Sequence, residues 1–134
     1  MSPPISVPHH LSQITRPFSQ TLLATLDNSH DIKIALLDGP YVFHSHPDND
    51  ELFYIISGSL VIEIMDGDRS EGEGEVEEVK MEKGDLYIVK QGVRHKPTGK
   101  MAQVMVIEKK GVLDGNGEIA KNIGGSRRNE SSHL

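Results

Sequence analysis

Two histidines and a glutamate stand close together in the first half of the chain, and both residue types bind metal ions. His44 and His46 are two residues apart, so on a β-strand their imidazoles share a face, whereas on a helix they would diverge by about 200°. Residues 47–50 (PDND) have the chemistry of a reversing turn, and Glu51 follows them. Imidazole nitrogens and carboxylate oxygens are ligands of divalent transition metals. Residues 41–58 therefore predict two strands joined by a turn, with a chelating histidine pair beside a carboxylate.

A fourth candidate ligand lies in the second half of the chain. Residues 84–95 contain a glycine, a short apolar run, a second glycine and then His95. In the first stretch, four residues separate His46 from Glu51 and six separate Glu51 from Gly58. With these two motifs the chain resembles a small, single-domain member of the cupin family. The residues that carry the resemblance are Gly39, His44, His46, Glu51 and Gly58 in the first motif, and Gly84, Gly92 and His95 in the second.

The resemblance covers about residues 31–108, and it implies a fold and a ligand set. The implied fold is all-β, a cupin-type double-stranded β-helix of the jelly-roll barrel type. The family's metal ligands correspond to His44, His46, Glu51 and His95. Two positions depart from the family pattern, because Lys90 stands where proline is usual and Gly99 where asparagine is usual. Neither is a ligand, so the departure at Lys90 affects only the expected stiffness of the turn before His95.

Composition limits the classes of protein to which the chain can belong. With 134 residues we expect one barrel domain, and 36% hydrophobic and 25% charged residues are ordinary for a globular protein. A net charge of -6 disfavours nucleic acid as a partner, since its phosphates are bound by Lys and Arg. The chain has no cysteine, which fits a reducing compartment, and no apolar run of secretory-signal or membrane-span length. We therefore expect a cytoplasmic protein that has no membrane partner.

The first third of the chain predicts an arm followed by a hairpin. Three prolines in the first eight residues favour an extended arm over residues 1–14, which should be removable as far as Pro8 without unfolding the protein. Residues 15–26 fit a helix and a strand equally well by pattern, and the resemblance favours a strand. Residues 27–30 form a turn cluster, after which an alternating strand should begin. The apolar residues of that alternation are Ile32, Ile34 and Leu36.

Short strands with turn signals between them continue through residues 15–110, which we assign to the barrel. Ser57-Gly58-Ser59 should reverse the chain, and further strands are expected at residues 60–65, 76–81, 86–89 and 101–108. The last has Met101, Gln103, Met105 and Ile107 on one side and Ala102, Val104 and Val106 on the other. The acidic, glycine-rich residues 68–75 predict a solvated loop. Residues 111–134 have too little apolar content to bury a face and should form a flexible, mostly disordered tail.

Alternation along the strands also predicts which side chains line a substrate pocket. Phe53 and Ile55 lie on the side of Glu51, and Val42 lies on the side of His44, so we expect these three to form apolar, substrate-binding walls. Tyr54 and Tyr87 should face the other way. Gln103 would add a polar group if its face is the inner one. Glu51 and Gln103 are the candidates for a catalytic role.

The predicted cofactor is one divalent metal ion, and Fe, Mn, Ni, Co and Zn all suit these ligands. Four protein ligands leave two positions open on an octahedral ion. The resemblance implies an enzyme that converts a small, oxygen-rich metabolite as an isomerase, a lyase or decarboxylase, or a dioxygenase, in the manner of cupins of natural-product metabolism. The alternative is a non-catalytic binding module for a sugar or other small metabolite. Sheet edges and the hairpin over residues 21–37 would allow a homodimer.

Overall fold

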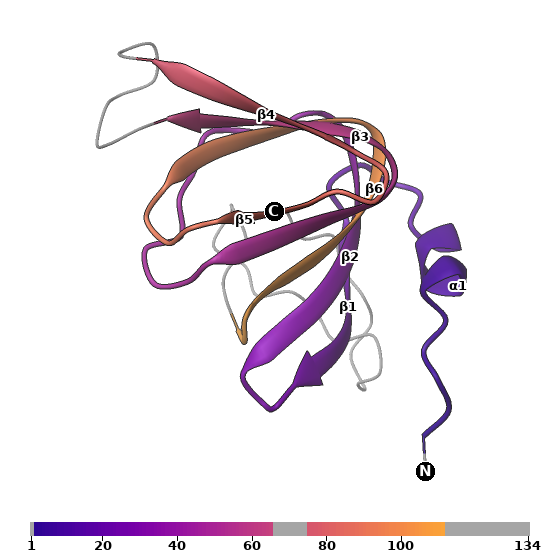
Figure 1. Cartoon of the computed structure of the whole chain (residues 1–134). Coiled ribbons are helices and arrows are strands. Elements are labelled where there is room, and N and C mark those ends of the chain that lie inside the picture. The colour runs from indigo at the N-terminus through magenta and orange to yellow at the C-terminus, as the bar shows by residue number, and fades with distance from the viewer. Residues whose placement is uncertain (1, 66–74, 112–134) are drawn as a thin grey trace.

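The computed structural model describes residues 2–65 and 75–111, and nearly all of their regular structure is antiparallel β-sheet (Figure 1). The elements are α1 (Val7–Ser12), β1 (Gln20–Leu26), β2 (His30–Pro40), β3 (Glu51–Met65), β4 (Val76–Glu82), β5 (Leu86–Val89) and β6 (Arg94–Lys109). The strand order is β1-β2-β6-β3-β4, and β5 pairs with β3. The all-β prediction is confirmed. Residues 68–74 of the acidic loop and residues 112–134 of the tail lie outside the described residues.

The three long strands β2, β3 and β6 bend at one level and fold the sheet over on itself. Pairing shifts between Leu37 and Gly39 in β2 and between Ile55 and Ser59 in β3, and Met101 of β6 has a φ of 47°. Figure 1 shows the ribbons turning this corner into two facing layers. One layer contains β1, β2, β5, the first half of β3 and the second half of β6. The other contains β4 with the remaining halves of β3 and β6.

Two glycines allow the backbones to approach one another at this corner. Gly58 has a φ of +75°, and a Cβ atom there would lie 2.1 Å from the carbonyl oxygen of Met101. A Cβ atom on Gly99 would lie 2.1 Å from the carbonyl oxygen of Leu37, so an asparagine would not fit at this position. The expected reversal of the chain at residues 57–59 is wrong, since β3 runs through them with a bulge.

The hairpin predicted after the N-terminal arm is confirmed. Leu26 of β1 pairs with His30 of β2, and the amide of Ser29 donates to the carbonyl of Leu26 at 2.9 Å. Asp27 and Asn28 have φ values of 52° and 53°, which Asn and Asp tolerate better than most residues. The strands expected at residues 76–81 and 86–89 are confirmed as β4 and β5, and that at 101–108 is part of the longer β6.

The main core lies between the two layers. Its buried members are Ala35, Leu37, Phe53, Ile55, Leu60, Ile62, Met81, Val89, Ala102, Val104 and Val106. In β6 the predicted alternation is confirmed, with the even-numbered residues inside. In β2 the inner face belongs to Lys33, Ala35 and Leu37, which pair with the inner face of β6, and Ile34 is buried on the outer face. The alternation was ambiguous because both faces of β2 are covered.

The N-terminal segment contains a short helix, so the expected fully extended arm is wrong. Ser6 caps α1, since its side chain accepts a hydrogen bond from the amide of His9 at 3.3 Å. A proline in the first turn is compatible with helix initiation because its missing N–H has no partner there in any case. Leu11 is 5% exposed and packs with Leu23 and Ile34 on the outer face of the sheet. The helix thus shields this face from water.

Truncation at two points should show the contribution of α1. Removing residues 1–5 is expected to change the free energy of unfolding by less than about 0.5 kcal/mol, because these residues are exposed where described. Removing residues 1–12 also deletes Leu11 and should cost about 2–4 kcal/mol, in the range of a buried leucine lost from a core. Urea unfolding of both truncated proteins measures this difference. Equal stability of the two would contradict a packing role for α1.

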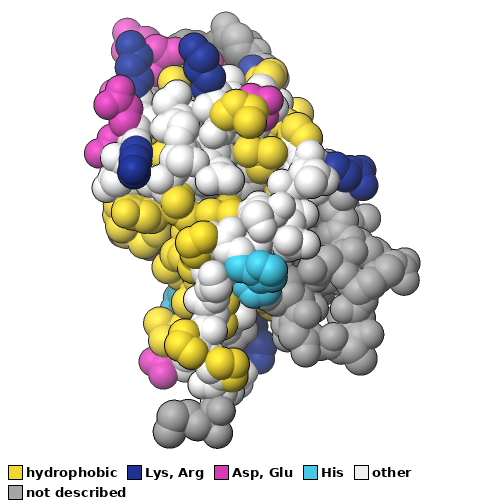
Figure 2. Space-filling model, turned by 90° about the vertical axis from the view of Figure 1, so that its right-hand side faces the viewer, with side chains coloured by type: hydrophobic (Ala, Val, Ile, Leu, Met, Phe, Trp, Pro, Cys, Tyr) yellow, Lys and Arg dark blue, Asp and Glu magenta, His cyan; other side chains and the backbone are white. Residues whose placement is uncertain are grey.

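The outer strands of the sheet differ in their surface chemistry. β4 carries exposed Glu77, Glu78, Lys80 and Glu82, and such charges discourage pairing with another strand. Figure 2, which views the side that carries α1, shows charged side chains gathered at one end and hydrophobic ones along the remainder of this face. The homodimer stays a prediction. In the part of the chain that the structure describes, no helix has the length and apolar character required to cross a lipid bilayer.

Candidate metal centre

The four predicted ligands lie together at the end of the two layers that is farthest from the corner. Each of His44, His46, Glu51 and His95 offers one ligand atom, and these atoms lie within 4.8 Å of one another. Glu51 begins β3 and His95 is the second residue of β6, so both precede the bends of their strands by several residues. His95 is 0% exposed and Glu51 1% exposed. The sequence prediction that these four side chains converge is met by the geometry.

The backbone that carries the first two histidines is less regular than expected. Residues 41–46 form no strand, and His44 makes only an isolated bridge with His95. In this bridge the amide of each residue donates to the carbonyl of the other, at 3.0 and 2.9 Å. The turn after His46 is present at Pro47 and Asp48. The strand expected to carry His44 and His46 is therefore absent, and the bridge holds His44 directly opposite His95 instead.

Backbone carbonyls orient two of the imidazole rings. The Nδ1 atom of His44 lies 2.9 Å from the carbonyl oxygen of Val42, and that of His95 lies 3.0 Å from the carbonyl oxygen of Val93. Since a carbonyl only accepts, each Nδ1 carries the hydrogen and Nε2 faces the cluster. The Nε2 atoms of His44 and His46 are buried without a hydrogen-bond partner. An unsatisfied buried polar atom costs about 1–3 kcal/mol, so both atoms call for a further partner.

Glu51 stands between two of these histidines. Its Oε1 atom lies 3.1 Å from Nε2 of His95 and 3.3 Å from Nε2 of His46. Complete burial would raise the pKa of the Glu51 carboxyl, but the contacts with His46 and His95 outweigh burial and hold the pKa well below its usual range. An ionised carboxylate oxygen and an imidazole lone pair repel each other unless a cation, a proton or a metal ion, lies between them. The arrangement is therefore suited to hold a cation.

The donor set fits a divalent transition metal. Burial, together with the proximity of His95, lowers the pKa of His44 to about 4, which leaves its ring neutral and able to act as a ligand at neutral pH. Two ligand atoms at opposite sides of an ion with bonds of about 2.1 Å are about 4.2 Å apart. The 4.8 Å limit on the separations in the cluster exceeds this by little, so small side-chain rotations bring all four atoms within bonding distance.

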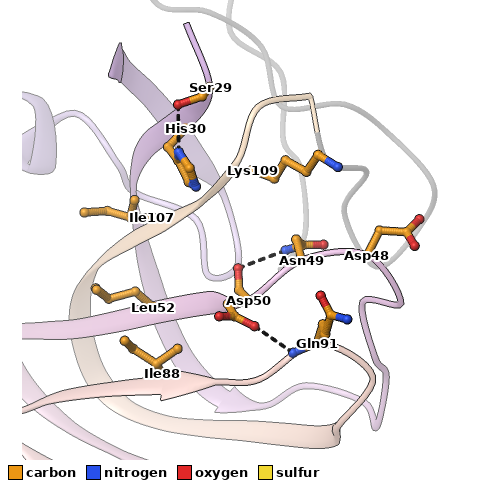
Figure 3. A pocket seen from close by; sticks show the side chains of 10 residues that line it. All are labelled: Ser29, His30, Asp48, Asn49, Asp50, Leu52, Ile88, Gln91, Ile107 and Lys109. Carbon is orange, nitrogen blue, oxygen red and sulfur yellow. Dashed lines mark hydrogen bonds between the residues drawn. The ribbon is translucent and has the colours of Figure 1, made fainter. Parts of the chain in front are cut away.

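The turn before His95 is held firmly although it lacks a proline. The amide of Gly92 donates to the carbonyl of His46 at 2.8 Å, and the amide of Val93 donates to the carbonyl of Lys90 at 3.1 Å. The amide of Gln91 donates to a carboxylate oxygen of Asp50 at 2.9 Å (Figure 3). These bonds tie the turn to the segment that carries the other ligands. The absence of proline at Lys90 had put the stiffness of this turn in question, and these hydrogen bonds supply it.

A comparison with known protein families identifies the architecture. The family model of the cupin domain matches residues 38–108, which include all four candidate ligands. The chain belongs to the cupin family. Among curated proteins, the uncharacterized protein YdbB of Bacillus subtilis (strain 168) is 44% identical over 39 residues, which cover 29% of this chain and 34% of that protein.

Two solved structures illustrate the range of proteins with this fold. A cupin-2 domain containing protein from Shewanella frigidimarina NCIMB 400 is 26% identical, with a TM-score of 0.68 over 79% of this chain and 94% of that one. Hydroquinone 1,2-dioxygenase PnpCD, solved with Cd2+ and 4-hydroxybenzonitrile, is 12% identical, with a TM-score of 0.61 over 84% of this chain and 74% of that one. The second likeness shows a shared fold alone.

The inward orientation expected for Phe53 and Ile55 is confirmed and that expected for Val42 is wrong, while the role of the first two as substrate-binding walls stays a prediction. Phe53 and Ile55 are fully buried on the inner face, and the ring centroid of Phe53 lies 6.3 Å from that of His95. Val42 is 58% exposed, because the irregular backbone around it does not follow strand alternation. Its contribution to the site is the carbonyl that orients His44.

The predicted outward orientation is confirmed for Tyr54 of β3 and wrong for Tyr87 of β5. Tyr54 faces outward, as predicted, and lines a groove beside α1. Tyr87 was expected to face outward too, but it packs against the inner core of this cupin. The reason is the strand register, in which Tyr87 stands directly opposite Phe53 and therefore shares its face.

Gln103 is not part of the centre. It lies on the outer face of β6, in the groove of about 450 Å³ between α1 and the sheet, and its Oε1 accepts a hydrogen bond from the Ser57 hydroxyl at 2.8 Å. Its catalytic role depended on an inward orientation, so that candidate is withdrawn. The inner face of this strand ends instead at Glu108, which sequence analysis did not single out. The sequence did contain a signal for Glu108, because this residue continues the alternation of Ala102, Val104 and Val106 along the same face of the strand.

Glu108 and Lys33 lie behind Glu51 on the inner face. Glu108 stands directly opposite Glu51 in the register of β3 and β6, its Oε1 lies 3.2 Å from Nζ of Lys33, and its Oε2 is buried without a hydrogen-bond partner. Burial, followed by the charge of Glu51, raises the pKa of Glu108 to about 9 although Lys33 opposes the shift.

An aromatic group borders the centre on another side. The ring centroid of Tyr41 lies 5.2 Å from that of His44, and the ring centroid of Phe18 lies 5.4 Å from that of Tyr41. Sequence analysis missed both residues, although Tyr41 is only three positions before His44. These rings give the site a flat, largely apolar flank.

A separate pocket of about 480 Å³ lies on the outer face of this cupin (Figure 3). Its lining residues are Ser29, His30, Asp48, Asn49, Asp50, Leu52, Ile88, Gln91, Ile107 and Lys109. None of the four candidate ligands is among them. The apolar side chains of Leu52, Ile88 and Ile107 come from three adjacent strands and face away from the core.

Proposed function

We propose that this cupin is a metal-dependent enzyme that converts a small, oxygen-bearing organic molecule. The observation that carries the proposal is the convergence of three imidazoles and one carboxylate in a buried cluster, where the Nε2 atoms of His44 and His46 make no hydrogen bond. Mixed nitrogen and oxygen ligands are suited to Fe, Mn, Co, Ni or Zn as the resident ion. A divalent ion held there would supply Lewis-acid polarisation of a substrate oxygen and, if redox-active, dioxygen chemistry.

The remaining residues of the centre prepare the site for a substrate. Phe53 and Ile55 exclude water from the inner side of the ligands, and low local polarity strengthens electrostatic interactions there. The ring of Tyr41 beside His44 offers a flat surface for a planar or aromatic portion of a substrate. The dioxygenase that shares this fold acts on hydroquinone, a small phenol, which supports the inclusion of phenols among the candidates.

Turnover by the metal-loaded protein tests this function. A panel of hydroxy acids, sugars, phenols and diketones is incubated with protein loaded separately with each candidate metal, in air and without oxygen. We expect conversion of at least one compound class, lost after chelation and restored by the metal. Undiminished anaerobic turnover would select isomerase, lyase or decarboxylase chemistry, and a strict oxygen requirement would select a dioxygenase.

The non-catalytic alternative has its own signature in the same experiment. A compound that binds the loaded protein with measurable heat but is never converted would replace the enzyme by a binding module. Protein that carries His46→Ala serves as the control, because contaminating enzymes would be unaffected by loss of this ligand. Activity that persists in this variant would have to be assigned to a contaminant.

A further inference from the structure

The buried pair of Lys33 and Glu108 has no part in the ligand set or in the walls described above. Lys33 is 2% exposed and Glu108 is 3% exposed, and their Nζ and Oε1 atoms are 3.2 Å apart. Both project from the inner faces of β2 and β6, where the other side chains are mainly apolar. Long polar side chains are rarely placed in such an interior unless they are paired.

Stability alone is a poor explanation for this pair. Removing a lysine ammonium and a carboxyl group from water is costly whether or not the carboxyl is ionised, and replacing such a buried pair by apolar residues of similar volume is often neutral or stabilising. A second observation points to another role. Glu108 pairs directly with Glu51 in the register of β3 and β6, so the two buried side chains are neighbours on the inner face.

A continuous series of contacts therefore runs from Lys33 to the ligand cluster. Nζ of Lys33 lies 3.2 Å from Oε1 of Glu108, Glu108 stands directly opposite Glu51, and Oε1 of Glu51 lies 3.1 Å from Nε2 of His95. The terminal torsion of a glutamate is broad, so a free carboxylate has no preferred orientation of its own. Contact from behind limits this rotation and directs Oε1 toward the histidines.

We propose that Lys33 and Glu108 are a positioning pair that fixes the Glu51 carboxylate in the orientation required for metal binding. Lys33 holds Glu108, and Glu108 holds Glu51. The inference rests on the proposed metal site and adds two residues to it. Groups that orient metal ligands in this way typically change metal affinity by about 10–100-fold when they are removed.

The test measures Co2+ affinity by calorimetry and the visible absorption spectrum of the bound ion, which reports its coordination geometry. Glu108→Leu removes the contact with Glu51 and should weaken Co2+ binding by about 10–100-fold and alter the spectrum. Glu108→Gln retains an acceptor for Lys33 and a donor for Glu51, so its affinity should stay within about threefold of the unmodified protein. Rescue by this conservative variant distinguishes positioning from loss of packing.

The double variant Lys33→Met/Glu108→Leu protects the test against misfolding, because it leaves no unpaired charge inside. It should melt, without metal, no lower than the unmodified protein, yet bind Co2+ as weakly as Glu108→Leu alone. Lys90→Met is the matched control, because Lys90 also pairs with a carboxylate near the site, Asp50 at 3.5 Å, but is 71% exposed. Its Co2+ affinity should not change.

The experiment distinguishes failure of the proposed metal site from failure of the positioning role. If the unmodified protein binds no Co2+, both the metal site and this inference are overturned. If it binds Co2+ and the double variant binds equally tightly with the same spectrum, the metal site stands and the positioning role is overturned.

Discussion

Removal of divalent metal is expected to lower the melting temperature of this cupin by about 10 °C. A ligand that binds only the folded state stabilises it by about 2.7 kcal/mol at a hundredfold excess over Kd, and for a chain of this size each kcal/mol shifts the melting temperature by a few degrees. The effect should be large because the ion would partner the buried Nε2 atoms of His44 and His46. Calorimetry before and after chelation, and again after metal is restored, measures it.

A control variant separates the buried centre from adventitious binding at the surface. His9 and His10 are adjacent on α1, their ring centroids are 5.3 Å apart, and surface histidines of this kind also bind metal ions weakly. A variant with both changed to alanine should retain the full metal-dependent shift. If the shift disappears with this surface pair, or is absent from the unmodified protein, the buried cluster does not hold the ion.

The ligand set could be predicted from sequence because its spacing is a local property. His44, His46 and Glu51 lie within one short stretch, and only His95 had to be brought in from elsewhere through the family resemblance. The geometry required a long-range contact all the same, since the isolated bridge that places His44 opposite His95 replaces the expected strand. Residue types and spacing thus revealed the candidate site, while its backbone depended on pairing with β6.

The assignments of Gln103 and Tyr87 share a physical cause, which is that alternation does not say which face is inside. Gln103 and Tyr87 were misplaced or left open because both faces of their strands carry apolar residues. Lys33 escaped notice for the same reason, since its neighbours Ile32 and Ile34 made the opposite face of β2 look like the core. Register between strands decides these orientations, and register is set by contacts far apart in the chain.

The corner of the sheet shows a second limit. Ser57-Gly58-Ser59 has turn chemistry, but the same residues suit a bulge in a continuous strand. The choice is made by β6, whose Met101 carbonyl approaches Gly58 too closely for a side chain. From the sequence, Gly99 was only a departure from the family pattern. The structure explains it, because the backbone of Leu37 leaves no room for a side chain at this position. Close backbone approach is a tertiary property, so a sequence alone signals it only as a glycine.

Substitution of His46 by alanine is expected to remove metal binding while the fold remains. A lost ligand should weaken binding by more than about 100-fold, the upper end of what changes behind the ligands cost. The fold should persist because the structural contact of this residue is made by its backbone, whose carbonyl accepts a hydrogen bond from the amide of Gly92 at 2.8 Å. Its Nε2 atom lies 3.3 Å from Oε1 of Glu51, and that oxygen keeps its 3.1 Å contact with His95 after the substitution.

Two measurements on the His46→Ala variant decide the outcome. Its melting temperature without metal should lie within a few degrees of that of the chelated, unmodified protein, and metal should not raise it. The matched control is His30→Ala, which removes an exposed ring that is hydrogen-bonded to the hydroxyl of Ser29 and should leave the metal-dependent shift intact. If the His46→Ala protein is still stabilised by metal as strongly as the control, three ligands suffice and the fourfold centre is wrong. If the His46→Ala protein unfolds without metal, the side chain of His46 supports the barrel itself. The ligand set must then be tested through Glu51→Gln, which keeps the volume of the glutamate side chain but makes it a weaker ligand.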